Sequence, residues 1–156
     1  MKIKLLMIGK TQEKYLIEGF EIYKKRIVHY LPFEEVMIPV LKDNKNMKDA
    51  EVKQKEGEML LKNLREDDFV VLLDERGKQY DSIEFSAFLQ QRMNVATKTL
   101  TFIIGGAFGL SDEVYARANH QLSISKMTFS HQIIRVIFME QLYRAFSIIN
   151  NEPYHK

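Results

Sequence analysis

The sequence contains no cysteine, and it has only three prolines and seven glycines among its 156 residues. The absence of cysteine excludes disulfides, zinc–thiolate sites, iron–sulfur clusters and every mechanism that attacks through a thiolate. Long apolar runs are also lacking, because the stretch 133–139 is too short to span a membrane. A strand-like N-terminus runs directly into a charged helix, which is not the shape of a signal peptide. We therefore expect a cytoplasmic protein without membrane contact.

An excess of charge of one sign is missing as well. The chain has 23 basic and 21 acidic residues, and this net charge of +2 is too small to identify a nucleic-acid-binding protein. From residue 114 onward, however, five lysines and arginines accompany only two glutamates, and three of the four histidines (His120, His131 and His155) lie there too. A basic face that recruits a phosphate backbone would have this composition. A chance excess of this size explains it equally well.

Apolar periodicity predicts one α/β domain over residues 1–156. Strands are expected at 2–8, 33–40, 69–73, 100–104 and 120–124, and helices at 12–29, 50–64, 82–93, from 111 and from 132. The segment 75–78 is expected to be a loop, and Ser82 is expected to cap the helix that it begins. Strands and helices alternate without repeats or low-complexity tracts. This pattern predicts a parallel or mostly parallel sheet covered by helices on both faces.

The long final helix is apolar on two sides. Its broad core face includes Arg135, which must be paired or face a polar cavity because an unpaired buried charge is costly. The opposite arc mixes polar residues with Ile133, Ile137 and Ile148. A helix of this kind is covered on both sides, either by its own chain or by another subunit. We favour the second alternative, a homodimer.

Three of the predicted strands end in segments suited to ligand binding. Gly105 and Gly106 follow one strand in IIGGAFGL, while LLDERGK at 72–78 and SISKMTFSH at 123–131 follow two others. The glycines match neither a P-loop nor the GxGxxG fingerprint, and alone they indicate a tight turn more often than a ligand site. Because ligands of open α/β sheets bind at the carboxyl ends of strands, the three loops together are expected to enclose a nucleoside.

Other patterns are weaker. Motifs for catalytic zinc, calcium loops and serine nucleophiles are all missing, and we expect no metal. The C-terminal pair Tyr154 and His155 follows Pro153 and is either a disordered end or an aromatic and an imidazole that cap a bound base.

Several motifs occur together in a characteristic order: MIGK at 7–10, KEGE at 55–58, LLDERGK, IIGGAFGL, LSISKMTFSHQIIRV at 122–136, EQLYRAFSI at 140–148 and PYHK at 153–156. With them the chain resembles, over its whole length, the ribosomal RNA large subunit methyltransferase H (RlmH) family of SPOUT methyltransferases. The resemblance implies a C-terminal trefoil knot, which overrides the rule that connections do not thread through loops. It also implies a homodimer that methylates N3 of a pseudouridine in helix 69, the intersubunit stem-loop of 23S ribosomal RNA, in the assembled ribosome.

The resemblance further implies the site residues. The methyl donor S-adenosylmethionine would lie, in a bent shape, against Leu73, Gly105, Ile124, Ser125, Lys126, Met127, Thr128 and Phe129. Arg144, Tyr154 and His155 match family positions associated with the RNA site, and would serve the cofactor of the partner subunit. Ser130 stands where the family often has proline, which concerns only the stiffness of this segment.

The implied chemistry suits a chain without cysteine. N3 of a pseudouridine is a weak acid, so its methylation needs proton removal or charge stabilisation but no covalent adduct. Two other functions remain open. A flavodoxin-like nucleotide-binding module would need a phosphate-binding loop after the first strand, where MIGKTQEK offers one glycine. A non-catalytic ribosome-binding factor would explain the basic C-terminal region.

Overall fold

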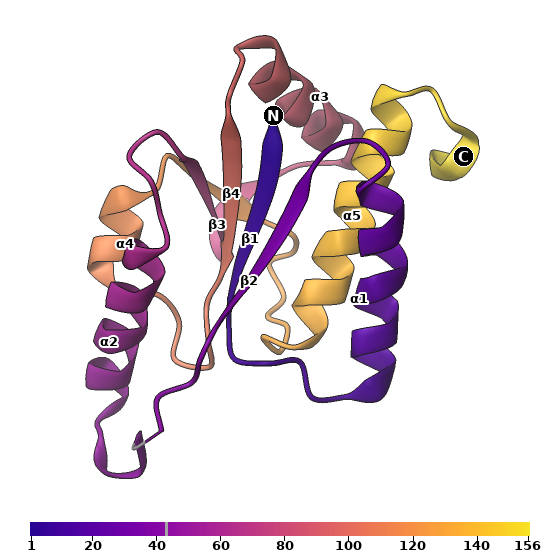
Figure 1. The fold of residues 1–156 in the computed structure, drawn as a ribbon. Helices are drawn as coiled ribbons and strands as arrows, with labels where there is room; N and C mark the ends of the chain where they lie inside the picture. Colours follow the sequence, from indigo (N-terminus) through magenta and orange to yellow (C-terminus); the bar gives the residue numbers. More distant parts are fainter. Residues whose placement is uncertain (43) are drawn as a thin grey trace.

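The computed structural model describes residues 1–42 and 44–156. A parallel sheet of five strands, in the order β2-β1-β4-β3-β5, forms the centre of the molecule (Figure 1). The elements in chain order are β1 (Lys2–Ile8), α1 (Lys14–Ile27), β2 (Phe33–Ile38), η1 (Asn44–Asn46), α2 (Asp49–Lys62), β3 (Phe69–Gln79), α3 (Ser82–Asn94), β4 (Thr99–Ile104), α4 (Asp112–Arg117), β5 (His120–Ser123), α5 (Ile133–Ile149) and η2 (Pro153–His155). The predicted α/β class and parallel sheet are confirmed, while the trefoil knot stays a prediction.

Helices cover both faces of the sheet, as predicted. Helices α1, α3 and α5 pack together on one face, and α2 and α4 lie on the other (Figure 1). Strand β1 shows why both faces need cover. Leu5 and Met7 point into the core beneath α1 and α5, while Leu6 and Ile8 point into the core beneath α2 and α4. Successive side chains of a strand point to opposite faces, so the uninterrupted apolar run 5–8 of β1 must be buried on both.

The core face predicted for α5 is also confirmed. Phe138, Met139, Leu142 and Phe146 are almost inaccessible to solvent, and the ring of Phe138 lies 4.7 Å, centroid to centroid, from that of Phe102 in β4. Burial of each of these side chains contributes about 2 kcal/mol of transfer free energy. Helix α5 is therefore the central support of its layer, with α1 and α3 packed beside it.

Strand β3 is longer than predicted. The segment 75–78, expected to be a loop, continues β3 to Gln79, and its end pairs with β5 through Lys78 and Gln79 after an irregularity in register. A Cβ at Gly77 would lie 2.7 Å from the carbonyl carbon of Gln121, so only glycine permits this close approach of the two backbones. Such pairing depends on the backbone, and apolar periodicity gives no sign of it.

Several predicted boundaries also move. The cap of α3 is Asp81 rather than Ser82: Asp81 accepts a hydrogen bond from the backbone N–H of Glu84, and the Glu84 side chain accepts one from the N–H of Asp81. This capping box satisfies two N–H groups that the helix leaves free. Strand β2 ends at Ile38 rather than at residue 40, because Pro39 has no N–H to continue the ladder.

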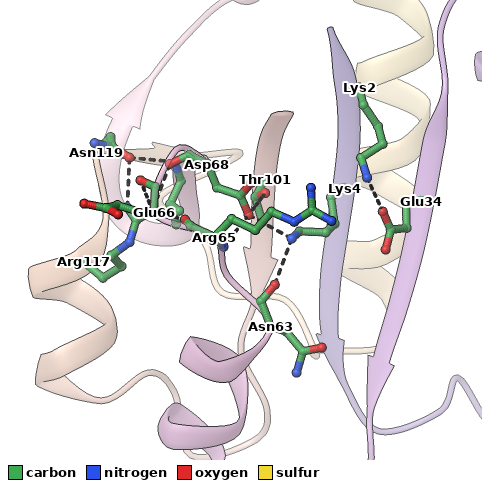
Figure 2. Close-up of polar contacts among 11 residues, drawn as sticks. Lys2, Lys4, Glu34, Asn63, Arg65, Glu66, Asp68, Thr101, Arg117 and Asn119 are labelled. Atoms are coloured by element: carbon green, nitrogen blue, oxygen red, sulfur yellow. Dashed lines mark hydrogen bonds and ion pairs between the residues drawn. The ribbon is translucent and has the colours of Figure 1, made fainter. Parts of the chain in front are cut away.

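A buried ion pair joins β1 to the segment before β3 (Figure 2). The Lys4 ammonium lies 2.8 Å from the Asp68 carboxylate and donates to the carbonyl oxygen of Asn63, and the Thr101 hydroxyl donates to the same carboxylate. Burial alone would raise the pKa of Asp68, but the hydrogen bonds from Lys4, Arg65 and Thr101 outweigh it and lower the pKa. The pair therefore stays charged inside the protein near neutral pH.

Candidate cofactor site and C-terminal tail

A cavity of about 350 Å³ lies at the carboxyl ends of β3, β4 and β5. Its apolar wall includes Leu73, Ile104, Leu110, Leu122 and Ile124, and the segment 125–131 also lines it. The three strand-end loops thus meet around one space. Of the residues predicted to bind the cofactor, those that line the cavity are Leu73, Gly105, Ile124, Ser125, Met127, Thr128 and Phe129, while Lys126 is not part of the lining.

The segment after β5 is held by short polar contacts. The Ser123 hydroxyl donates to the carbonyl oxygen of Ser125, whose own hydroxyl accepts a hydrogen bond from the N–H of Met127. These contacts turn the chain and leave the Met127 side chain 77% exposed and that of Phe129 42% exposed. Two large apolar side chains at the mouth of a cavity are available to contact a ligand or a second subunit.

The loop after β4 folds back over Gly105. The N–H of Gly109 donates to the carbonyl oxygen of Gly106, and Gly109 has a φ of +82°, which side chains rarely tolerate. A Cβ at Gly105 would lie 3.1 Å from the Leu110 side chain. Any larger residue at Gly105 must therefore displace Leu110 and narrow the cavity.

A polar cluster at the wall of this cavity was not predicted. The Asp74 carboxylate accepts hydrogen bonds from the Arg76 guanidinium and from the Tyr115 hydroxyl, and both Asp74 and Tyr115 line the cavity. Burial alone would raise the pKa of Asp74, yet these hydrogen bonds outweigh it and lower the pKa. Asp74 thus supplies a fixed negative charge at neutral pH. In the sequence its only sign is an acidic residue at a strand end.

Arg135 links the start of α5 to the end of β1 through hydrogen bonds. Its side chain has no exposed surface and donates to the carbonyl oxygens of Ile8 and Gly9 and to the Thr11 hydroxyl. Of the two alternatives predicted for a buried Arg135, pairing or a polar cavity, the structure shows pairing, through hydrogen bonds to neutral acceptors. The partners are mostly backbone carbonyls at a strand end, which are themselves left free where the ladder stops.

The C-terminal tail packs against α5. The Tyr154 hydroxyl donates to the Glu140 carboxylate at 3.0 Å, and the Arg144 guanidinium lies 2.5 Å from the same carboxylate and 4.9 Å from the centre of the Tyr154 ring. Burial raises the pKa of Tyr154, as do its hydrogen bonds with Tyr23 and Glu140. The structure thus brings Arg144 and Tyr154 together through Glu140. His155 follows and is exposed.

Within one chain the tail does not meet the cavity. Ile134, in the first turn of α5, lines the cavity, whereas the tail follows the last turn at the other end of the helix (Figure 1). Arg144 follows Ile134 by ten residues, about 15 Å along the helix, and Arg144, Tyr154 and His155 do not line the cavity. If these residues and the cavity form one active site, a second copy of the chain can bring them together.

Known proteins resemble the chain over its full length. The sequence model of the family described as predicted SPOUT methyltransferase matches residues 1–155. The chain is 52% identical over 155 residues to ribosomal RNA large subunit methyltransferase H from Parabacteroides distasonis and 54% identical to that from Christiangramia forsetii, with 99% of both chains covered in each case. The chain belongs to the ribosomal RNA large subunit methyltransferase H family of SPOUT methyltransferases.

One solved structure gives a more distant match to this SPOUT methyltransferase. The putative methyltransferase Lpg2936 from Legionella pneumophila, solved with bound S-adenosylmethionine, has 13% identity and a TM-score of 0.48. The match covers 93% of this chain and 66% of that chain, and a likeness this distant does not bear on the site.

Two further features of this SPOUT methyltransferase concern the described residues, 1–42 and 44–156. They contain no group of three or more histidine, aspartate or glutamate side chains placed to hold a metal ion. None of their helices is long and apolar enough to cross a membrane.

Proposed function

We propose that this SPOUT methyltransferase transfers a methyl group from S-adenosylmethionine to N3 of a pseudouridine in helix 69 of 23S ribosomal RNA, acting in the cytoplasm on the assembled ribosome. The observation that carries the proposal is the single cavity formed by the ends of β3, β4 and β5. The names of these two relatives support ribosomal RNA of the large subunit as the substrate.

The cavity has the size and chemistry that S-adenosylmethionine needs. A volume of about 350 Å³ lies within the usual range of small-ligand pockets. Leu73, Leu122 and Ile124 offer an apolar surface for an adenine ring, and Gly105, Gly106 and Gly109 add backbone to the lining. The carboxylate of Asp74, which is paired with the Arg76 guanidinium, is also part of the lining. When bound, the cofactor supplies an electrophilic methyl group.

The residues proposed to hold the cofactor come from the three loops. They are Leu73, Gly105, Ile124, Ser125, Lys126, Met127, Thr128 and Phe129. Seven of these eight positions line the cavity, and Lys126 does not. We assign Lys126, which is exposed, to the solvent side of the segment, where an ammonium is available to RNA phosphates.

The RNA side of the site is proposed to come from the partner subunit. Arg144, Tyr154 and His155 do not line the cavity of their own chain, so they would act on the cofactor of the second copy. Arg144 suits phosphate recognition, Tyr154 can stack on a base, and His155 can position the base or accept a proton. The half-buried Ile133, Ile137 and Ile148 on α5 support a homodimer that would complete this composite site.

Two measurements test the proposed function. Calorimetric titration of the protein with S-adenosylmethionine should show binding, and the protein should transfer labelled methyl groups to intact ribosomes from a strain that lacks the enzyme. Mass spectrometry of the RNA should place the methyl group on N3 of one pseudouridine in helix 69. Binding to ribosomes without cofactor binding would instead indicate a non-catalytic ribosome-binding factor. Methylation of another nucleotide would overturn the assigned substrate.

A further inference from the structure

A second cavity, of about 510 Å³, adjoins the proposed cofactor cavity. It lies at the carboxyl ends of β1 and β2, and its lining includes Lys10, Val40, Glu56 and Gln132. Both cavities are lined by Gly106, Ala107 and His131, so they share a wall. A ligand in the second cavity would therefore lie directly beside a ligand in the first.

Glu56 is the unusual residue of this second cavity. It lies in α2, only 4% of its surface is exposed, and its Oε2 atom has no hydrogen-bond partner among the described residues. A Cβ added to Gly106 would lie 2.9 Å from Oε2 and 3.4 Å from Oε1. Both carboxylate oxygens therefore face the glycine that the two cavities share, and the missing side chain of Gly106 leaves room for them.

Few interactions within the chain offset the burial of the Glu56 carboxylate. Burial raises the pKa of Glu56, and burial is the only cause of the shift. Lys10 and His131 line the same cavity, and the uncharged Ser111 hydroxyl lies near Gly57, the neighbour of Glu56 in α2. Glu56 forms no hydrogen bond or ion pair with Lys10, His131 or Ser111. A buried carboxylate without partners destabilises a fold. Such groups concentrate at catalytic sites, where a carboxyl with a raised pKa is an effective proton acceptor.

The chemistry of the cavity suits a uracil-type ring. The edge of such a ring at N3 presents an N–H flanked by two carbonyl oxygens. A carboxylate such as Glu56 accepts from the N–H, and the Lys10 ammonium or the backbone N–H groups of residues 106–108 can donate to the carbonyl oxygens. Gln132 lies in the same wall but is already engaged, because its amide donates to the Lys10 carbonyl and accepts from the N–H of Gln12.

We infer that the second cavity receives the target base and that Glu56 is the group that accepts the proton from N3. This inference rests on the proposed function. The N3–H bond breaks as its proton passes to the Glu56 carboxylate, and the electron pair left on N3 forms a bond to the methyl carbon. The carbon–sulfur bond breaks with its electrons remaining on sulfur, so the cationic sulfonium becomes a neutral thioether. Glu56 then releases the proton to water, which completes the balance.

The test compares Glu56→Gln with Glu58→Gln. Both changes remove one negative charge from α2, but Glu58 is exposed to solvent. Single-turnover methyl transfer to ribosomes should fall roughly 10²-fold or more in Glu56→Gln, the scale of a lost acid–base group, and should stay at the wild-type rate in Glu58→Gln. Titration with S-adenosylmethionine should give the same affinity for all three proteins. Glu56→Asp, which keeps a shortened proton acceptor, should recover part of the rate.

Two further readouts separate catalysis from a structural role. Glu56→Gln should melt at or above the temperature of the wild type near pH 8, because it removes an uncompensated buried charge. The methyl-transfer rate of the wild type should rise with pH as Glu56 loses its proton. This rise should be absent from the pH profile of Glu56→Gln. A rise with pH that persists in the variant would assign the titration to a group other than Glu56 and would overturn the inference.

The outcomes keep the two proposals apart. If wild-type protein binds the cofactor but never methylates ribosomes, the proposed function is wrong. If the wild type is active and Glu56→Gln matches it within about twofold with an unchanged pH profile, the proposed function stands and the role of Glu56 is refuted. A Glu56→Gln variant that fails to fold, together with a Glu56→Asp variant of unchanged turnover and pH profile, would also refute it.

Discussion

The guanidinium of Arg135 donates a hydrogen bond of 2.9 Å to the carbonyl oxygen of Gly9, and so ties the first turn of the last helix to the end of the first strand. The same side chain donates to Ile8 and Thr11. Because His131 and Gln132 come just before this turn and line the second cavity, the position of Arg135 also sets the position of that wall.

Arg135→Lys should destabilise the fold although it keeps the charge. An ammonium cannot reach all three acceptors from one rotamer, and the carbonyls of Ile8 and Gly9 would be left partly unsatisfied. We expect the free energy of unfolding to fall by roughly 3 kcal/mol, measured by urea denaturation. Arg76→Lys is the matched control, since 69% of the Arg76 side chain is exposed. Equal stability of the two variants would contradict the structural role.

Lys4→Met should lower the free energy of unfolding more than the removal of an exposed ion pair does. It leaves the Asp68 carboxylate buried without its cation, which costs about 3–5 kcal/mol, whereas the double variant Lys4→Met, Asp68→Leu should regain much of the loss. Lys2→Met is the control, because the Lys2–Glu34 pair is partly exposed and contributes about 1 kcal/mol or less. Urea denaturation of the four proteins gives the comparison. A double variant less stable than Lys4→Met would contradict it.

The Asp68 pair also predicts a dependence on pH. Because the pKa of Asp68 is lowered in the folded protein, its contribution is present in full above the pKa of an unfolded aspartate, about 3.9, and is lost as pH falls through the folded value. The difference in unfolding free energy between wild type and Asp68→Asn should therefore be constant near neutral pH and shrink in acid. A difference that stays constant down to pH 2 would exclude this linkage.

Gly105→Val should weaken cofactor binding without unfolding the protein. The branched side chain would meet Leu110, whose side chain lies 3.1 Å from the position of a Cβ, and would push it into the cavity. We expect the affinity for S-adenosylmethionine to fall at least tenfold, or about 1.4 kcal/mol, in calorimetric titration. The melting temperature serves as the control for folding. Unchanged affinity in a folded variant would remove Gly105 from the site.

Ile137→Asp should disrupt a homodimer. Ile137 is half-buried in the single chain, on the arc of α5 that is otherwise polar, and a carboxylate there would be desolvated in an interface. Sedimentation should show dimers for the wild type and monomers for the variant, with loss of methyl transfer. Val95→Asp, an exposed position after α3, should remain dimeric. A monomeric wild type would contradict the proposed assembly.

His155→Ala should impair methyl transfer and little else. His155 is exposed, so its removal should leave melting temperature and cofactor affinity nearly unchanged while turnover on ribosomes falls by roughly 10² or more. Mixed dimers with Gly105→Val test its action across subunits. If the tail acts on the cofactor of the partner subunit, both changes affect the same active site of the mixed dimer, and the other active site keeps its activity. If the tail acts on the cofactor of its own subunit, each active site carries one change and the mixed dimer is inactive. Full turnover by His155→Ala would exclude the role.

Much of the fold could be predicted from local pattern, because β1 is apolar at five of its seven positions and α1 and α5 repeat at helical spacing. The extension of β3 through residues 75–78 could not, because it depends on backbone pairing with β5 and on the close approach at Gly77. Periodicity likewise gives the span of α3 but not its cap at Asp81, which a hydrogen bond to Glu84 decides.

The candidate site divides in the same way. The strand ends at Leu73, Gly105 and Ile124 could be placed together because parallel strands share an edge. The hydrogen-bond and ion-pair partners of the charged residues could not be predicted from the sequence. Glu140 joins Arg144 to Tyr154, and Glu56 lies against Gly106, through contacts between residues far apart in sequence or set by side-chain rotamers.

The position of α5 also constrains how the chain is made. Strand β1 lies between β2 and β4, and apolar side chains of α1, among them Phe20 and Ile27, share a core with α5, which is synthesised after all five strands. During translation the nascent chain can pair β1 with β2 early, but its larger core stays open until residues 133–149 leave the exit tunnel. Premature termination before α5 should therefore yield an aggregation-prone, protease-sensitive fragment rather than a smaller folded protein.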